Sequence, residues 1–238
     1  MLFFYIRHGE PIYDPDSLTT LGHAQANALA GRLSLHGLDQ IYSSSSTRAM
    51  QTAQPTCDIL KKEMTICDWA NERYAWDVFT IKKEDGKSEW CFMDDEMCQL
   101  FLSPEVRSMG MDWYKHPSFT QYDFAKGMKH ANEAVDNFFS ELGYQHDREN
   151  ARYKIVKANS NRVALFAHAG FGMCFLSSLL DIPYPMFCTH FDLGHSSMTV
   201  INFKEQGDYA YPRVLQYSND SHLYRENILT GYNNEIHF

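Results

Sequence analysis

The chain contains no long apolar run, no cluster of basic residues and no closely spaced pair of cysteines. No segment approaches the roughly 20 apolar residues that a membrane-spanning helix needs, and the N-terminus lacks the basic and apolar regions of a secretory signal. A formal net charge of −9 without basic clusters disfavours nucleic acid and anionic membranes as partners, because both bind clustered cations. We therefore expect a cytoplasmic protein with no nucleic-acid partner and no membrane partner.

The six cysteines are scattered along the chain, with no C-x-x-C motif and no His/Cys spacing typical of zinc. Such cysteines are expected to be reduced and buried as small hydrophobic residues. The sequence also shows no cluster of residues typical of a divalent-metal site. We therefore expect neither a metal nor another cofactor.

The chain begins with an apolar segment, LFFYI, that runs directly into charged residues. A short apolar run bounded by a glycine predicts a buried strand over 2–7. Arg7, His8 and Glu10 follow at its end, and charged groups there are costly unless something pairs them. Either Arg7 pairs with Glu10, or these side chains bind a ligand.

Strand and helix patterns alternate along much of the remaining chain. Strands are expected at 2–7, 40–44, 64–69, 163–168 and 196–203, and helices at 18–37, 46–62, 125–143 and 171–180. Thr19 or Thr20 is the expected N-cap of the first helix and Gly37 its stop, while Pro55 is expected to kink or restart the second. The alternation predicts an α/β fold with three layers, in which helices cover both faces of a mainly parallel central sheet.

Two segments show no clear period. Residues 72–129 are rich in aromatic and acidic residues, and we expect a helical cap or lid insertion there because long structureless loops are rare in compact domains. The segment from Tyr211 onward is polar and is expected to be irregular. The length of 238 residues is consistent with a single domain, 1–238, that carries this insertion.

Four side chains are expected to meet at one edge of the sheet. Arg7 and His8 end the first strand, His168 ends the strand at 163–168, and Arg48 lies near the start of a helix that follows a strand. Ligands on such sheets bind beyond the carboxyl ends of the strands. Two guanidinium groups and two imidazoles at that edge predict a phosphate site, because guanidinium forks match phosphate oxygens.

A histidine in such a site can attack phosphorus directly, which gives a phosphohistidine that water later hydrolyses. The neighbouring cations stabilise the charge on the equatorial oxygens during the transfer. Protein cations that do this make a metal ion unnecessary.

Several motifs resemble those of the histidine phosphatase superfamily, in its phosphoglycerate mutase-like branch. RHGEP, LTTLGHAQANALAGRL, YSSSSTRAMQTA, VALFAHAGFG and SSMTVINF occur in the order of the family's motifs. The resemblance implies the family's α/β fold and implies that His8 is the nucleophile. It also implies that Arg7, Arg48 and His168 hold the phosphoryl group.

The resemblance implies a carboxylic acid as well, which protonates the leaving oxygen. ANERYAW resembles the family's N-E-R stretch and places this acid at Glu72, with Asp77 and Glu84 as poorer substitutes. His195, in GHSSM, lies where family members often place a polar residue near the phosphate. The SSSST tract before Arg48 either supplies hydroxyl donors to phosphate or forms a polar turn.

We therefore expect a metal-independent phosphomonoester phosphatase that acts on a phosphorylated small molecule through a covalent phosphohistidine. The alternatives are a cofactor-dependent phosphoglycerate mutase, which the short linker PIYDPDS disfavours, and a non-catalytic phosphate-binding protein. The sequence leaves a homodimer open. The other histidines are expected to be structural or solvated: His23, His36, His116, His130, His146, His190, His222 and His237.

Overall fold

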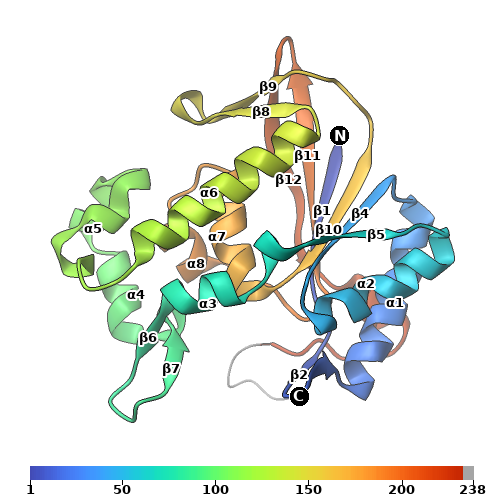
Figure 1. Cartoon of the computed structure of the whole chain (residues 1–238), viewed down its shortest axis with the longest axis horizontal. Helices are drawn as coiled ribbons and strands as arrows, with labels where there is room; N and C mark the ends of the chain where they lie inside the picture. Colours follow the sequence, from blue (N-terminus) through green and yellow to red (C-terminus); the bar gives the residue numbers. More distant parts are fainter. Residues whose placement is uncertain (233–238) are drawn as a thin grey trace.

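Eight strands form one mixed sheet at the centre of the computed structural model, which describes residues 1–232 (Figure 1). Their order across the sheet is β5-β4-β10-β1-β11-β12-β9-β8. The strands are β1 (Leu2–Arg7), β4 (Gln40–Ser44), β5 (Met64–Cys67), β8 (Tyr144–Asp147), β9 (Arg152–Ile155), β10 (Arg162–Ala167), β11 (Met198–Gln206) and β12 (Tyr209–Asn219).

The sheet is parallel from β5 to β1 and antiparallel from β1 to β8. Strand β1 lies in the middle of the sheet, between β10 and β11. Helices cover both faces of the sheet at this strand. Side chains of successive residues in a strand point to opposite faces, and Phe3 and Tyr5 pack in one core while Phe4 and Ile6 pack in the other. The expected α/β fold with three layers is confirmed, and the parallel half carries the predicted strand ends.

Helices α1 (Thr20–His36) and α2 (Thr47–Leu60) cover one face of the sheet (Figure 1). The side chain of Thr19 accepts a hydrogen bond from the backbone N–H of Gly22, and Gly37 ends α1 with a φ of 66° that favours glycine. The expected cap and stop are therefore confirmed. Helix α2 runs through Pro55 as a single element, so the expected restart there is wrong.

Helices α6 (Phe124–Glu141), α7 (Ala169–Leu179) and α8 (Tyr184–His190) lie on the opposite face (Figure 1). The ring of Phe3 lies 5.1 Å from that of Phe139 and 6.2 Å from that of Phe175, measured between centroids. These contacts attach α6 and α7 directly to the central strand.

Residues 72–129 form several short helices, as expected, together with a two-stranded hairpin that was not expected. The elements are α3 (Arg73–Phe79), β6 (Thr80–Lys82), β7 (Ser88–Trp90), α4 (Asp95–Phe101) and α5 (Pro104–Ser108), with short 3-10 turns between them. The buried rings of Phe101, Trp113 and Phe119 pack against Phe124 of α6 and Tyr184 of α8. The aromatic residues of this segment therefore share one core with the helices beside the sheet.

The expectation of an irregular tail from Tyr211 is wrong as far as Arg225 and holds for residues 226–232, which contain no helix or strand; residues 233–238, with His237, lie outside the described residues. Strand β12 pairs with β11 along its length, and α9 (Ser221–Arg225) follows it. Most side chains of β12 are exposed or half-buried, so its backbone pairing leaves no apolar period in the sequence. Strands β8 and β9 and helix α8 were not expected either, because each is short.

The six cysteines are free thiols, five of them buried and Cys98 partly buried, as expected. None of the helices within residues 1–232 is both long enough and apolar enough to cross a membrane.

Candidate active site

The loop after β1 is held by side chains of both neighbouring helices. Thr52 of α2 accepts a hydrogen bond from the backbone N–H of Gly9 at 3.0 Å, and Gln25 of α1 accepts one from that of Glu10 at 2.8 Å. A Cβ on Gly9 would lie 2.6 Å from the carbonyl oxygen of Gly22. The loop therefore approaches the start of α1 so closely that only glycine fits.

His8 is buried, and its two ring nitrogens have different partners. Nδ1 lies 2.7 Å from the carbonyl oxygen of Gly9, so it carries the proton and donates it. Nε2 accepts a hydrogen bond from Nε of Arg48 at 3.2 Å through its single lone pair, so this nitrogen carries no proton. Burial, and then the charges of His168, Arg7 and Arg48, hold the pKa of His8 well below its usual range. His8 is therefore a neutral imidazole with an available nucleophilic atom.

Arg48 is positioned by two carboxylates. Its Nη1 pairs with Oδ1 of Asp16 at 2.8 Å and its Nη2 with Oε2 of Glu72 at 3.3 Å. The other oxygen of Asp16 accepts a hydrogen bond from the backbone N–H of Thr47 at 2.7 Å. Asp16 thus ties the β2–β3 hairpin (Pro11–Tyr13 and Asp16–Leu18) to the start of α2. No pattern in the sequence pointed to Asp16, because it lies in a short linker without periodicity.

Glu72 directly precedes α3, and its carboxylate lies at the N-terminus of α7. Its Oε1 accepts hydrogen bonds from the backbone N–H groups of Gly170 at 2.8 Å and Phe171 at 3.3 Å. Burial raises the pKa of Glu72, although Arg48 and Arg7 oppose this shift. The predicted substitutes Asp77 and Glu84 are exposed and form no hydrogen bond or ion pair with the site.

His168 is buried beside Glu72, and serine hydroxyls orient it. Its Nε2 lies 2.8 Å from Oγ of Ser44 and 3.3 Å from Oγ of Ser46. Its Nδ1 has no hydrogen-bond partner within residues 1–232 and lies 3.4 Å from Oε2 of Glu72. Burial lowers the pKa of His168 well below its usual range. The serines before Arg48 therefore contact His168, an arrangement that the sequence did not predict.

Arg7 is buried and does not pair with Glu10. Its Nη1 donates to the carbonyl oxygen of Leu193, its Nη2 lies 2.8 Å from Nε2 of His195, and its Nε has no partner within the described residues. The carboxylate of Glu10 instead accepts a hydrogen bond from the hydroxyl of Thr19 at 2.6 Å. The first of the two sequence alternatives, an Arg7–Glu10 pair, is therefore wrong.

His195 lies beside both Arg7 and His8. Its ring centroid is 5.9 Å from that of His8. Burial, and then the charge of Arg7, lowers the pKa of His195 to about 3. A neutral His195 accepts the Arg7 N–H at Nε2, which leaves Nδ1 to carry the ring proton.

The structure brings together all six residues that the sequence singled out for the site, from five separate segments of the chain. These six residues are Arg7, His8, Arg48, Glu72, His168 and His195. Within the described residues, the nearest ligand atoms of His8, Glu72 and His168 all lie within 4.8 Å of one another, so these three could hold a metal ion. The guanidinium groups of Arg7 and Arg48 beside them favour an anion instead.

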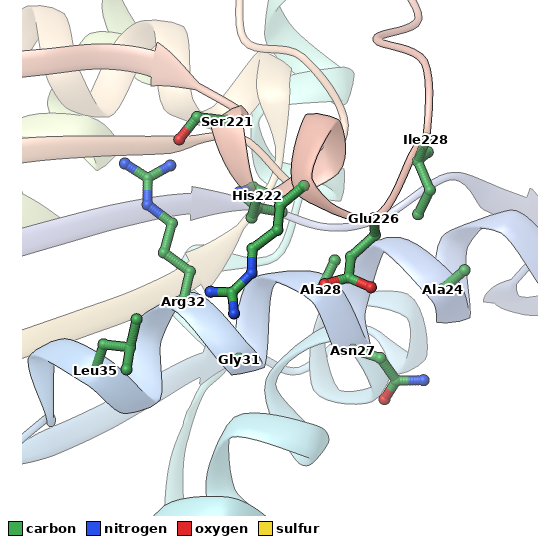
Figure 2. A pocket seen from close by; sticks show the side chains of 11 residues that line it. Ala24, Asn27, Ala28, Gly31, Arg32, Leu35, Ser221, His222, Glu226 and Ile228 are labelled. Atoms are coloured by element: carbon green, nitrogen blue, oxygen red, sulfur yellow. The ribbon is translucent and has the colours of Figure 1, made fainter.

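A cavity of ≈ 580 Å³ opens at Arg7 and continues past Ala169, the residue after His168. A second cavity of ≈ 790 Å³ lies between α1 and α9 (Figure 2). Figure 2 shows Arg32 extending from α1 towards Ser221, and none of the six predicted residues lines this hollow. The first cavity, which Arg7 lines, therefore lies beside the candidate site.

Residues 3–94 match the family model described as histidine phosphatase superfamily (branch 1). The resemblance to the histidine phosphatase superfamily is confirmed. The matched segment includes Arg7, His8, Arg48 and Glu72 and ends before His168. No curated protein matches the sequence.

Solved phosphatase structures have a similar fold. Phosphoserine phosphatase from Entamoeba histolytica is 18% identical with a TM-score of 0.59, over 93% of this chain and 98% of that chain. The mycobacterial glucosyl-3-phosphoglycerate phosphatase is 17% identical with a TM-score of 0.58, over 91% and 98%. The chain therefore has the histidine phosphatase fold over nearly its whole length.

Proposed function

We propose that this protein hydrolyses phosphomonoesters through a covalent phosphohistidine at Nε2 of His8. The observation that carries the proposal is the arrangement of that imidazole. Its Nδ1 proton is held by Gly9, and its Nε2 lone pair faces the guanidinium of Arg48. A nucleophile and a phosphate-binding cation thus meet at one point, where a phosphoryl group would replace their hydrogen bond, with phosphorus at Nε2 of His8 and an oxygen accepting the Arg48 N–H.

Two buried donors without partners support a phosphoryl group at this point. These are Nε of Arg7 and Nδ1 of His168. A buried donor left unpaired costs about 1–3 kcal/mol, and phosphate oxygens would pair both. This role requires the ring proton of His168 on Nδ1, and in that tautomer Ser44 donates its hydroxyl proton to Nε2.

In the first step, the Nε2 lone pair of His8 forms a bond to phosphorus while the bond from phosphorus to the leaving oxygen breaks. Protonated Glu72 gives its proton to that oxygen, which departs as a neutral alcohol. The raised pKa of Glu72 favours the protonated form that this step needs. Arg7, Arg48 and His168 stabilise the charge on the three equatorial oxygens.

In the second step, water attacks phosphorus and the bond to Nε2 of His8 breaks. The carboxylate of Glu72 accepts a proton from the attacking water, so Glu72 returns to its protonated form. Inorganic phosphate leaves, and His8 is neutral again. Across the two steps, one ester and one water give one alcohol and one phosphate.

Neither step of the proposed reaction involves a metal ion. Although His8, Glu72 and His168 could hold one, a cation at that point would lie beside two guanidinium groups and would occupy the nucleophilic nitrogen. We further propose that the whole chain acts as one domain and that residues 72–129 form a cap over the substrate.

The test is phosphate release from p-nitrophenyl phosphate in excess chelator, by the wild-type protein and by His8→Ala. We expect the variant to lose at least about 10³-fold in kcat/KM, because the nucleophile is gone. His23→Ala is the matched control, since His23 is an exposed histidine on α1. Rapid quenching should trap an acid-labile phosphoryl group on His8.

The other outcomes distinguish the alternatives. Hydrolysis that survives in His8→Ala would place the chemistry elsewhere. Isomerisation of 3-phosphoglycerate with little phosphate release would identify a mutase. Tight phosphate binding with no turnover of any ester would identify a phosphate-binding protein.

A further inference from the structure

Aromatic side chains from three segments of the chain line the cavity that opens at Arg7. Tyr13 comes from the β2–β3 hairpin, Trp90 and Phe92 from the 72–129 segment, and Phe191 from the end of α8. The rings of Trp90 and Phe92 stack at 5.4 Å between centroids with an interplanar angle of 17°. Phe191 and Tyr13 are 41% and 69% exposed, although large apolar side chains are usually covered. The cavity therefore offers flat apolar walls to a ligand.

Positive charge is scarce along these walls. Within residues 1–232, Arg7 is the only lysine or arginine that lines the cavity, and its Nη atoms already bind Leu193 and His195. Asp192 lines the same cavity and adds a carboxylate. A ligand that carried a second phosphate or a carboxylate would meet an acid and no free guanidinium fork.

The aromatic walls lie beside the group that we propose as the general acid. A Cβ on Gly170 would collide with the ring of Trp90, so this ring rests on the first turn of α7. The backbone N–H of Gly170 binds Glu72. The alcohol part of an ester, whose oxygen Glu72 would protonate, therefore has to lie against Trp90.

We infer that the cavity binds the alcohol part of a phosphomonoester, and that this part is aromatic and carries no second acid group. The inference rests on the proposed function and names the substrate class for the same site. A volume of ≈ 580 Å³ suits a small molecule with one or two rings. The aromatic side chains that line the cavity supply the binding surface, and Asp192 disfavours acidic esters.

The test compares three esters of primary alcohols, so that the acidity of the leaving group differs little. They are 2-naphthylmethyl phosphate, n-butyl phosphate and 3-phosphoglycerate. We expect kcat/KM for the naphthylmethyl ester to exceed that for 3-phosphoglycerate by at least about 10-fold, because a stacked ring is worth that much. Trp90→Ala should lower the naphthylmethyl value about 10-fold and the butyl value by less than about 2-fold.

Further variants guard against a loss of folding. Trp90→Phe should keep most of the preference, and Phe191→Ala, at a half-exposed position, should reduce it. Tyr224→Ala is the control, because Tyr224 is an 88% exposed aromatic residue of α9 that does not line this cavity. Asp192→Asn should raise kcat/KM for 3-phosphoglycerate relative to that for the butyl ester.

The outcomes separate this inference from the proposed function. Equal or faster hydrolysis of 3-phosphoglycerate, or a preference that Trp90→Ala leaves unchanged, would overturn the aromatic class and leave the phosphatase proposal standing. Binding of 2-naphthylmethylphosphonate, measured by calorimetry, gives a readout without turnover. Trp90-dependent binding with no hydrolysis of any ester would support the aromatic site and reject the phosphatase.

Discussion

The Nε atom of Arg48 donates a hydrogen bond to Nε2 of His8, and the two nitrogens lie 3.2 Å apart. Because a guanidinium only donates, this contact requires His8 to be unprotonated at Nε2. The same guanidinium contacts Glu72 and Asp16. Arg48 therefore connects the proposed nucleophile to the proposed acid. The carboxylate of Asp16 holds the Arg48 guanidinium in position.

The first prediction concerns the pH dependence of turnover. The proposed reaction needs neutral His8, whose pKa is lowered by burial and nearby positive groups, and protonated Glu72, whose pKa is raised by burial. Activity should rise with pH through the low pKa of His8 and fall again above the raised pKa of Glu72. We expect a bell-shaped profile of kcat/KM for n-butyl phosphate with its maximum on the acidic side.

Glu72→Gln provides the control for this profile. A good leaving group needs no proton, so the variant should retain most of its kcat/KM on p-nitrophenyl phosphate and lose at least about 10²-fold in kcat/KM on n-butyl phosphate, while kcat falls for both because the second step loses its base. The falling limb above the maximum should disappear. An unchanged falling limb in the variant would assign that limb to another group.

The second prediction makes Asp16 a positioning residue for Arg48. Removing its carboxylate in Asp16→Ala frees the Arg48 guanidinium and the N–H of Thr47. We expect kcat/KM to fall about 10- to 100-fold, because a small misplacement of a catalytic group is costly. Asp16→Asn keeps one acceptor and should recover part of the loss. Asp58→Ala, an exposed acid on α2, should change nothing, and Asp16→Ala with wild-type kinetics would refute the role.

The third prediction compares two glycines of the same helix. A Cβ on Gly22 would collide with the backbone of Glu10, whereas a Cβ on Gly31 would meet nothing within 4 Å. We expect Gly22→Ala to lower the free energy of unfolding by about 1–3 kcal/mol. Gly31→Ala should raise it by about 0.5–1 kcal/mol, because alanine favours a helix. Urea unfolding measures both, and equal values would contradict the close approach at Gly22.

The fourth prediction concerns His146, which lies between two carboxylates outside the site. Its Nδ1 is 3.1 Å from Asp136 and its Nε2 2.9 Å from Asp181, while Arg148 also pairs with Asp136. Burial alone would lower the pKa of His146, but hydrogen bonds to the two acids outweigh burial and raise it. Its contribution to stability is therefore present at low pH and is lost as the pH rises through the raised pKa.

His146→Gln tests this stabilisation. The variant should lose about 1.5–3 kcal/mol of unfolding free energy below the ordinary histidine pKa, since hydrogen bonds between charged groups are lost. The difference from wild type should shrink in mildly alkaline buffer. Urea titrations at two pH values measure it, and a difference that grows with pH would show the opposite sign.

The fifth prediction uses the ligand geometry of His8, Glu72 and His168. Zinc ions should inhibit turnover by binding these three groups, in competition with the phosphoryl group. Chelator should restore full activity and have no effect on protein that was never exposed to zinc. Inhibition that survives in Glu72→Gln with the same affinity would place the zinc elsewhere.

The sequence predicted the strand ends of the site because each carries a local signal. His8 and His168 follow apolar runs, and Arg48 begins a helix after a strand. It did not reveal Asp16, because the role of this linker acid depends on its contact with a helix 31 residues away, which no local pattern shows. It also did not show that Ser44 and Ser46 contact His168, more than 120 residues further along.

The sequence predicted the elements whose apolar side chains follow a regular period. It missed the elements that are held mainly by backbone pairing. The central strand and the helices beside it follow apolar periods, as Phe3 and Phe4 illustrate by packing into opposite cores. Strand β12 keeps only one of its eleven side chains buried, so its pairing with β11 left no pattern to recognise.

The central position of β1 has a consequence for how the protein is made. Both of its neighbours, β10 and β11, begin more than 150 residues later in the chain. At roughly 5–20 residues per second, a ribosome delivers them about ten to forty seconds after β1. During that interval this apolar strand has no partner in the sheet, so the nascent chain depends on rapid late folding or on a chaperone that shields the strand.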